Sequence, residues 1–302
     1  MKTPIEANLS HLGVLQLRGV DSQTFLQGQL SADMRQLCPT QLLLAGYHSR
    51  EGRVIAVARL VAPAPDLVLA VLPKELINQV AERLRKFVLR AKTTIVDASA
   101  DWRLTGIIAD AQPHGALPWP GARNRWLRVE QTSALPAAID DDAIGAGSGK
   151  ALQQFHAGDI ADGIPQIYAA TADRFVSQML NLDVLGAIAF DKGCYTGQEI
   201  IARAHYRGKV KRRLQRLRAT LPSSSLQPGT QGQLSDGRSF TVIDSVAEGD
   251  AGTQFLAVLP LESGDTGASE PPTLDRSAAA VAPSAGAQPL RAEVLGLPYS
   301  ID

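Results

Sequence analysis

The residues best suited to chemistry lie in the segment 192–199, which reads Lys-Gly-Cys-Tyr-Thr-Gly-Gln-Glu. Thr196 and Glu199 have the spacing of a capping box, in which the two side chains satisfy amides at the start of a helix. Cys194 is therefore predicted to lie just ahead of a helix N-terminus, two residues from Lys192. The unpaired helix amides and the ammonium group both favour a thiolate over a thiol. Cys194 is thus the best candidate for chemistry in the chain.

The same residues also allow a structural interpretation. A lone cysteine is most often a small buried apolar residue, and Glu199 could serve only as a helix cap. Gly193 and Gly197 could simply permit a tight turn, or they could let a ligand approach the backbone. The spacing of the motif does not decide between these alternatives.

The elements before the motif predict an α+β fold. Apolar stretches predict strands, and amphipathic stretches between them predict helices. Because short Gly- and Pro-containing breaks separate several of the strands, these are expected to pair antiparallel. The predicted strands are 12–17, 42–47, 54–61, 67–72, 93–96, 103–109, 126–130 and 185–190; the predicted helices are 22–30, with Asp21 as its N-cap, 74–90, and one that starts at Thr196 and ends before Gly208.

The segment 112–149 is rich in Pro and Gly and is predicted to be mostly loop. Its acidic triplet 140–142 is interpreted as solvated rather than metal-binding, because no other ligands are spaced around it. The two cysteines, Cys38 and Cys194, exclude a site of four thiolates within one copy of the chain. We therefore predict no metal site.

The last part of the chain has the pattern of a small all-β unit. Short apolar runs at 215–219, 239–245 and 255–259 are separated by turn residues, and 290–297 is suited to a closing strand, which predicts a β-barrel. The stretch 263–288 has almost no large apolar residues and is predicted to be disordered. The predicted domains are 1–208 and 209–302.

Charge is balanced overall but uneven locally. The chain has 30 basic and 30 acidic residues, yet 203–218 contains a run of Arg and Lys, and no acid occurs from 200 to 235. Such a run could bind RNA, or it could be the solvated side of a strand. No secretory signal and no apolar stretch long enough to span a bilayer is visible, so we expect a cytoplasmic protein.

Three segments together resemble the YgfZ family, the folate-binding relatives of the glycine-cleavage T-protein. They are 19–33, the pair 162–165 and 175–183, and the motif 192–199 extended to Arg203. The motif is the family's own signature. The resemblance implies three lobes arranged as a ring around a central opening that holds tetrahydrofolate. It also implies a role in assembling or repairing the clusters of iron–sulfur proteins, including radical enzymes that methylthiolate tRNA.

Roles for individual residues follow from the resemblance. Cys194 would be the reactive residue, with Lys192 beside it. The candidate folate contacts are Tyr195, Gly197, Gln198, Glu199, Asn181, Asp162 and Arg203. Asp162 and Glu199 are the carboxylates considered for the pterin ring. Partners would be iron–sulfur enzymes or assembly proteins, with RNA possible through the basic run.

Two other functions remain open. An active aminomethyltransferase would need a carboxylate in the region equivalent to 52–60, and none is present there. An RNA-binding module acting through 203–218 would not need Cys194. The missing carboxylate leads us not to predict an enzyme.

Overall fold

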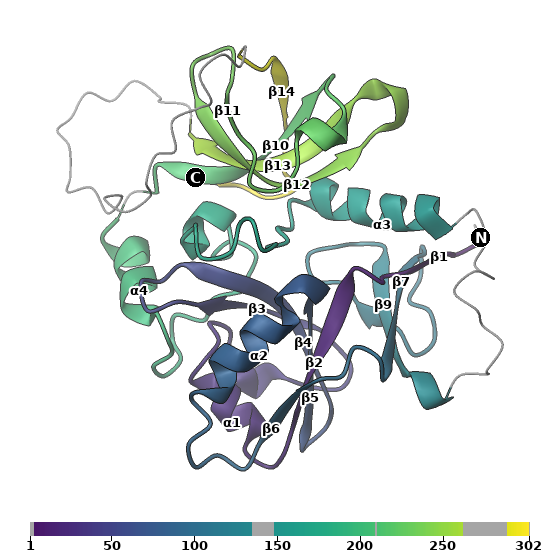
Figure 1. Cartoon of the computed structure of the whole chain (residues 1–302), viewed down its shortest axis with the longest axis vertical. Coiled ribbons are helices and arrows are strands. Elements are labelled where there is room, and N and C mark those ends of the chain that lie inside the picture. Colours follow the sequence, from purple (N-terminus) through teal and green to yellow (C-terminus); the bar gives the residue numbers. More distant parts are fainter. Residues whose placement is uncertain (1–2, 135–147, 209, 262–288, 302) are drawn as a thin grey trace.

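The strands form three antiparallel sheets, two of which lie on one side of a helix and the third on its other side (Figure 1). This computed structural model describes residues 3–134, 148–208, 210–261 and 289–301. Two sequence predictions, the solvated triplet 140–142 and the disordered stretch 263–288, lie outside the described residues. No helix within the described residues is long and apolar enough to cross a membrane.

The N-terminal sheet has the order β3-β4-β5-β2-β6 and confirms five predicted strands and their antiparallel pairing. Alternate residues of β5 face different cores: Val68 and Leu72 lie in one with α2, Leu69 and Val71 in another with the second sheet. Both faces are covered, which explains the nearly continuous apolar sequence. The strands are β2 (Leu12–Arg18), β3 (Leu43–His48), β4 (Val54–Ala64), β5 (Leu67–Pro73) and β6 (Thr94–Asp97).

The helices beside this sheet are shorter than predicted. Helix α1 is Ser22–Gln27, and Asp21 precedes it without capping it, because its carboxylate accepts from the Lys92 amide at 2.7 Å. The predicted helix 74–90 is a 3₁₀ turn followed by α2 (Ile77–Arg85). The Arg85 guanidinium donates to the Ile95 carbonyl of β6 at 2.7 Å, and the helix ends at this contact.

The second sheet, β1-β7-β9-β8, includes two strands that the sequence did not predict, β1 and β8, the second of them within the segment 112–149 where only 126–130 was predicted as a strand. Strand β1 (Ile5–Asn8) pairs with β7 (Trp102–Ile108), although the next strand in the chain, β2, belongs to the N-terminal sheet. The remaining strands are β8 (Leu117–Pro118) and β9 (Arg125–Gln131). The first residues of the chain thereby join two sheets.

The third sheet has the order β11-β12-β13-β10-β14, and the predicted barrel is not confirmed because this sheet is not closed. Leu234 and Leu290 form a single bridge near its two edges, where a barrel would need a continuous ladder. The strands are β10 (Arg212–Ala219), β11 (Gln231–Gln233), β12 (Ser239–Ala247), β13 (Thr253–Pro260) and β14 (Ala292–Leu295).

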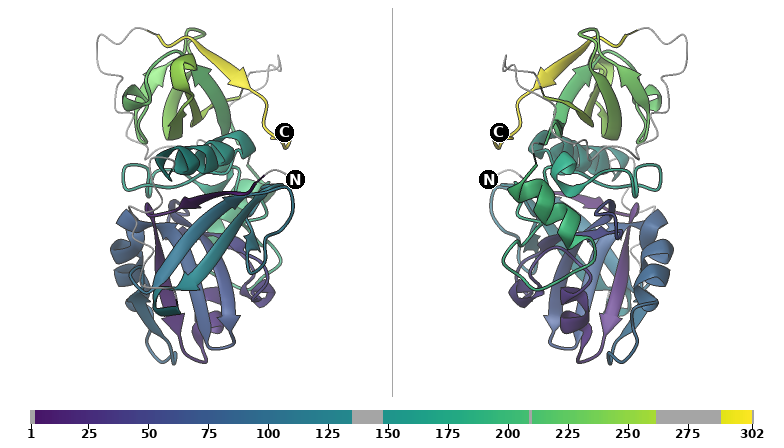
Figure 2. Two further views of the ribbon diagram at one scale, coloured as in Figure 1. Left: turned by 90° about the vertical axis from the view of Figure 1, so that its right-hand side faces the viewer. Right: turned by 90° about the vertical axis from the view of Figure 1, so that its left-hand side faces the viewer.

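Helix α3 (Ser148–Asp162) lies between the third sheet and the rest of the molecule (Figure 2). It packs against β1 and β7 on one side and against β12 and β13 on the other. Because protein covers two sides of this helix, it lacks the single apolar stripe of a surface helix. Its start also falls within the segment 112–149 that was predicted as loop, and so the sequence did not reveal it.

Candidate functional site

The motif 192–199 leads into α4 (Gln198–Tyr206) through an irregular loop. The apolar segment 185–190 before it was predicted as a strand, and this is wrong: it forms a turn and irregular chain. Asn181 has a left-handed backbone (φ 56°), and its carbonyl accepts from the Leu185 amide at 2.9 Å, which turns the chain there. Ala187 and Ile188 are nevertheless buried, so the apolar pattern reported burial and not a strand.

The predicted capping box is also wrong. The N-cap position is Gly197, with φ 82° and no side-chain cap, while the Glu199 carboxylate accepts from Arg203 at 2.8 Å. A Cβ atom at Gly197 would lie 2.6 Å from the Ser49 carbonyl oxygen. The glycine therefore lets the start of α4 lie directly against the β3–β4 turn.

Lys192 anchors the loop to the segment that follows α1. Its side chain is buried, and its ammonium donates to the carbonyls of Leu30 at 2.7 Å and Ala32 at 2.8 Å. The same ammonium lies 5.0 Å from the ring centroid of Tyr195. Burial lowers the pKa of Lys192 to about 8. Two of the three N–H groups of the ammonium thus bind backbone carbonyls and hold the loop in place.

A layer of buried side chains packs against the loop. Tyr195 is buried, and its ring lies 6.3 Å from that of His48, whose Nε2 bonds Ser177 Oγ at 2.5 Å. Burial lowers the pKa of His48 to about 3, so its ring is neutral at physiological pH. Cys194, in contrast, is exposed and is not in a disulfide. The structure therefore presents a thiol at the surface of a loop that is fixed on both sides of it.

The other predicted folate contacts lie in different surroundings. Asn181 is buried, where its amide donates to the Leu214 carbonyl at 2.9 Å, and Asp162 accepts from Arg125 at 2.8 Å. Gln198 is half-buried in the first turn of α4, and Arg203 is exposed and paired with Glu199. Asp162 and Asn181 thus hold the fold together away from the Cys194 loop.

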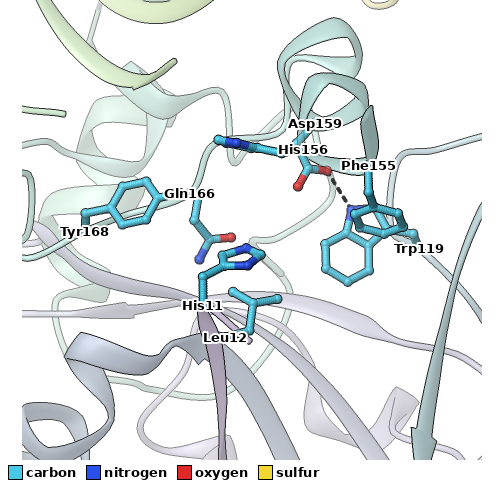
Figure 3. A pocket seen from close by; sticks show the side chains of 8 residues that line it. All are labelled: His11, Leu12, Trp119, Phe155, His156, Asp159, Gln166 and Tyr168. Atoms are coloured by element: carbon cyan, nitrogen blue, oxygen red, sulfur yellow. Dashed lines mark hydrogen bonds between the residues drawn. The ribbon is translucent and has the colours of Figure 1, made fainter. Parts of the chain in front are cut away.

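A cavity between β2, the β8–β9 connection and α3 is a second candidate site, which the sequence did not reveal (Figure 3). We refer to it as the central cavity. Its volume is about 10 Å³. Parts of β2, the β8–β9 connection, α3 and the segment after α3 contribute to its wall. The lining residues are His11, Leu12, Trp119, Phe155, His156, Asp159, Gln166 and Tyr168.

Buried charges surround this cavity. Asp159 accepts from Trp119 Nε1 at 2.7 Å and from Arg125 at 2.6 Å. Arg59 is fully buried, donates to Gln166 Oε1 at 2.7 Å and lies 4.1 Å from the Trp119 ring centroid. Within the described residues, Arg59 Nε and Nη2 and Gln166 Nε2 have no hydrogen-bond partner. Buried donors of this kind are costly unless a ligand or water meets them.

An ion pair joins the cavity to the third sheet. His156 Nε2 lies 2.8 Å from the Asp244 carboxylate of β12, and the exposed His11 ring lies 6.4 Å from that of His156. Burial lowers the pKa of His156, but the charge and hydrogen bond of Asp244 outweigh it and raise the value to about 9. His156 is therefore an imidazolium at neutral pH.

One signal could have pointed to this site. Phe155, His156 and Asp159 lie within one turn of a helix, where spacings of three and four residues share a face. Their partners Arg59 and Trp119 are too distant in sequence to be associated with them. Among the residues that the structure describes, no three His, Cys, Asp or Glu side chains are grouped to hold a metal ion.

The architecture is that of the aminomethyltransferase T-proteins. Glycine cleavage system aminomethyltransferase T from Bartonella henselae superimposes with a TM-score of 0.63, over 85% of this chain and 78% of that chain, at 12% sequence identity. That level of identity shows a shared fold alone. The sequence itself is 34% identical over 273 residues to the tRNA-modifying protein YgfZ of Edwardsiella ictaluri (strain 93-146), covering 81% of each chain. The chain therefore belongs to the YgfZ family, as its motifs predicted; no family model matches it.

Proposed function

We propose that this protein is a folate-binding accessory protein that supports assembly or repair of iron–sulfur clusters in tRNA-modifying enzymes through Cys194. The observation that carries the proposal is the exposed thiol on a loop whose neighbours, Lys192 and Tyr195, are buried. A fixed, accessible thiol is suited to reaction with a large partner. The cluster, or the partner's sulfur, is here the substrate.

Family membership supports the tRNA part of this proposal, because the curated relative is named a tRNA-modifying protein. The T-protein-like fold supports the folate part. An exposed thiolate can ligate an iron of a cluster or exchange with a disulfide, and both reactions require access to the sulfur. A buried structural cysteine could undergo neither reaction.

The central cavity has the chemistry expected of a pterin site. A pterin is a flat ring with acceptor atoms on one edge and donors on another, and the cavity offers aromatic walls, unpaired donors and a carboxylate. Gln166 and Arg59 would donate to the acceptor edge, and Asp159 would accept from the amino edge. The bound folate would supply a carrier for one-carbon units. A cavity of about 10 Å³ has room for about one water, so binding requires lining side chains to move.

Aminomethyl transfer is the alternative, and the structure gives it less support. The region 52–60 carries no carboxylate, and its one polar cavity neighbour, Arg59, is a cation. Asp159 is the carboxylate that lines the cavity, but Trp119 and Arg125 already bond it, and its pKa is lowered because the two arginines outweigh burial. A carboxylate held as a stable anion is a poor proton acceptor.

Complementation tests the proposal. In a bacterium that lacks its own family member, wild-type protein should restore iron–sulfur enzyme activity and tRNA methylthiolation, and Cys194→Ala should restore neither. Cys38→Ala is the matched control, because Cys38 is the other free cysteine and should be dispensable. Thermal unfolding followed by circular dichroism should show the same transition for Cys194→Ala as for wild type. Full restoration by Cys194→Ala would show that the thiol is incidental and would reject the proposal.

A further inference from the structure

Three aromatic rings gather on the surface where α4 ends. The rings of Phe190 and His205 stack with centroids 3.8 Å apart and an interplanar angle of 17°. The Tyr206 ring stands edge-on to His205 at 4.8 Å and to Phe190 at 6.1 Å. We refer to Phe190, His205 and Tyr206 as the α4 aromatic cluster.

The α4 aromatic cluster is anchored on one side and open on the other. Phe190 is half-buried and packs against the main hydrophobic core, so it fixes the position of the stack. His205 is exposed, and Tyr206 is 68% exposed. Ordered aromatic rings that remain in water are typical of a surface that binds a partner.

Positive charge borders the cluster. Arg203 and Arg207 of the same helix region and Lys211 beyond it are exposed. Arg203 shares its charge with Glu199, in an exposed pair of little energetic weight.

The remaining arginines of the basic run are used within the fold. Arg213 is buried and pairs with Asp183 at 3.0 Å, Arg216 bonds Gln254 at 2.6 Å, and Arg218 pairs with Glu248 at 2.9 Å. Among the described residues of the basic run 203–218, therefore, only the α4 end offers cations that RNA could bind. The positive charge available to a partner lies beside the aromatic rings.

We infer that the α4 aromatic cluster and its flanking cations bind single-stranded RNA. An unpaired base can extend a stack of exposed rings, while exposed arginines and lysines contact the phosphates on either side. A duplex hides its base faces and could use only the cations. Acidic peptides would use the cations but not the ring stack, so the combination favours RNA. The inference goes beyond the proposed function, which needs no direct contact between this chain and RNA.

Fluorescence anisotropy with the full-length protein and a labelled single-stranded RNA of roughly 12 nucleotides tests this inference. Tyr206→Ala should weaken binding about tenfold, because it removes the most exposed ring of the cluster, on whose face a base can stack, while Tyr206→Phe should bind like wild type. Arg207→Gln should lower the slope of log affinity against log salt by about one phosphate contact. Leu89→Ala, which changes an 86% exposed apolar residue of the N-terminal lobe, is the surface control and should change nothing.

Several results would overturn the inference. It fails if Tyr206→Ala binds the RNA like wild type, or if the matching duplex binds as tightly as the single strand. It also fails if Tyr206→Ala retains RNA binding but loses complementation, since the cluster would then dock a protein. Cys194→Ala should bind RNA normally, so failure of this inference and failure of the proposed function can be told apart.

Discussion

The Cys194 loop and the central cavity are built in opposite ways. The loop is one continuous stretch in which the Cys194 thiol is exposed and its neighbours Lys192 and Tyr195 are buried. The cavity collects side chains from distant segments, and its charges are buried with several donors unpaired. The loop can therefore meet a macromolecule, whereas the cavity is suited to a small ligand that satisfies its donors.

The two regions also depend differently on the rest of the fold. The loop is held mainly through Lys192, whose ammonium donates to the carbonyls of Leu30 and Ala32 and lies 5.0 Å from the Tyr195 ring centroid. The cavity residue Asp159 forms one buried network with Arg59 and Arg125, so that its loss leaves buried positive charge with fewer partners. Mutations should therefore affect stability most in the cavity and least at Cys194.

The largest effect is expected for Asp159→Asn. This change removes the buried carboxylate that Arg59 and Arg125 share, so that Arg59 loses its ion-pair partner and Arg125 retains Asp162, and it should destabilise the protein by about 3–5 kcal/mol. Urea denaturation would measure it. Glu199→Gln is the control, because it breaks an exposed pair worth at most about 0.5 kcal/mol. Equal midpoints for the two variants would contradict the network.

A smaller effect is expected for Lys192→Met. The change retains bulk but leaves the Leu30 and Ala32 carbonyls without their ammonium donor, at a cost of about 1–3 kcal/mol. Because the Lys192 ammonium donates to the Leu30 and Ala32 carbonyls, the loss of this anchor should outweigh the loss of a nearby positive charge, and Cys194 should also react faster with a thiol reagent. Lys86→Met, at an exposed lysine, should change neither quantity. Wild-type stability of Lys192→Met would show that Lys192 does not hold the loop.

Acid should act on both regions, because burial lowers the pKa of His48 and also lowers that of the cavity residue His11 to about 4, whereas alkali should act on the cavity through His156. The pKa of His48 is lowered to about 3 in the folded protein, so stability is lost as pH falls from about 6.5 toward 3. The pKa of His156 is raised to about 9, so its stabilisation is present below about pH 6.5 and is lost as pH rises through 9.

Two variants separate the loss of stability at low pH from the loss of stability at high pH. We expect the urea midpoint to fall less at low pH in His48→Gln, and to fall less at high pH in Asp244→Asn, when midpoints are measured across the pH range. An unchanged profile in both variants would mean that other groups dominate.

The sequence predicted most of the N-terminal sheet because short breaks and apolar runs are local signals. It singled out Cys194 as a candidate for the same reason, since the motif is contiguous. It gave the wrong structure for 185–190, because apolar content reports burial whether the chain is extended or irregular. It missed α3 and the cavity, because a helix covered on two sides has no single stripe and because Arg59 and Trp119 meet Asp159 only in the fold.

The most direct test of the account is to titrate tetrahydrofolate into wild type, Gln166→Glu and Cys194→Ala by calorimetry. Gln166→Glu retains the acceptor for Arg59 but loses the unpaired amide donor, and should weaken binding about tenfold. Cys194→Ala should bind with wild-type affinity while failing in complementation. If Cys194→Ala loses folate affinity, or Gln166→Glu binds like wild type, the separation of a ligand cavity from a surface thiol is wrong.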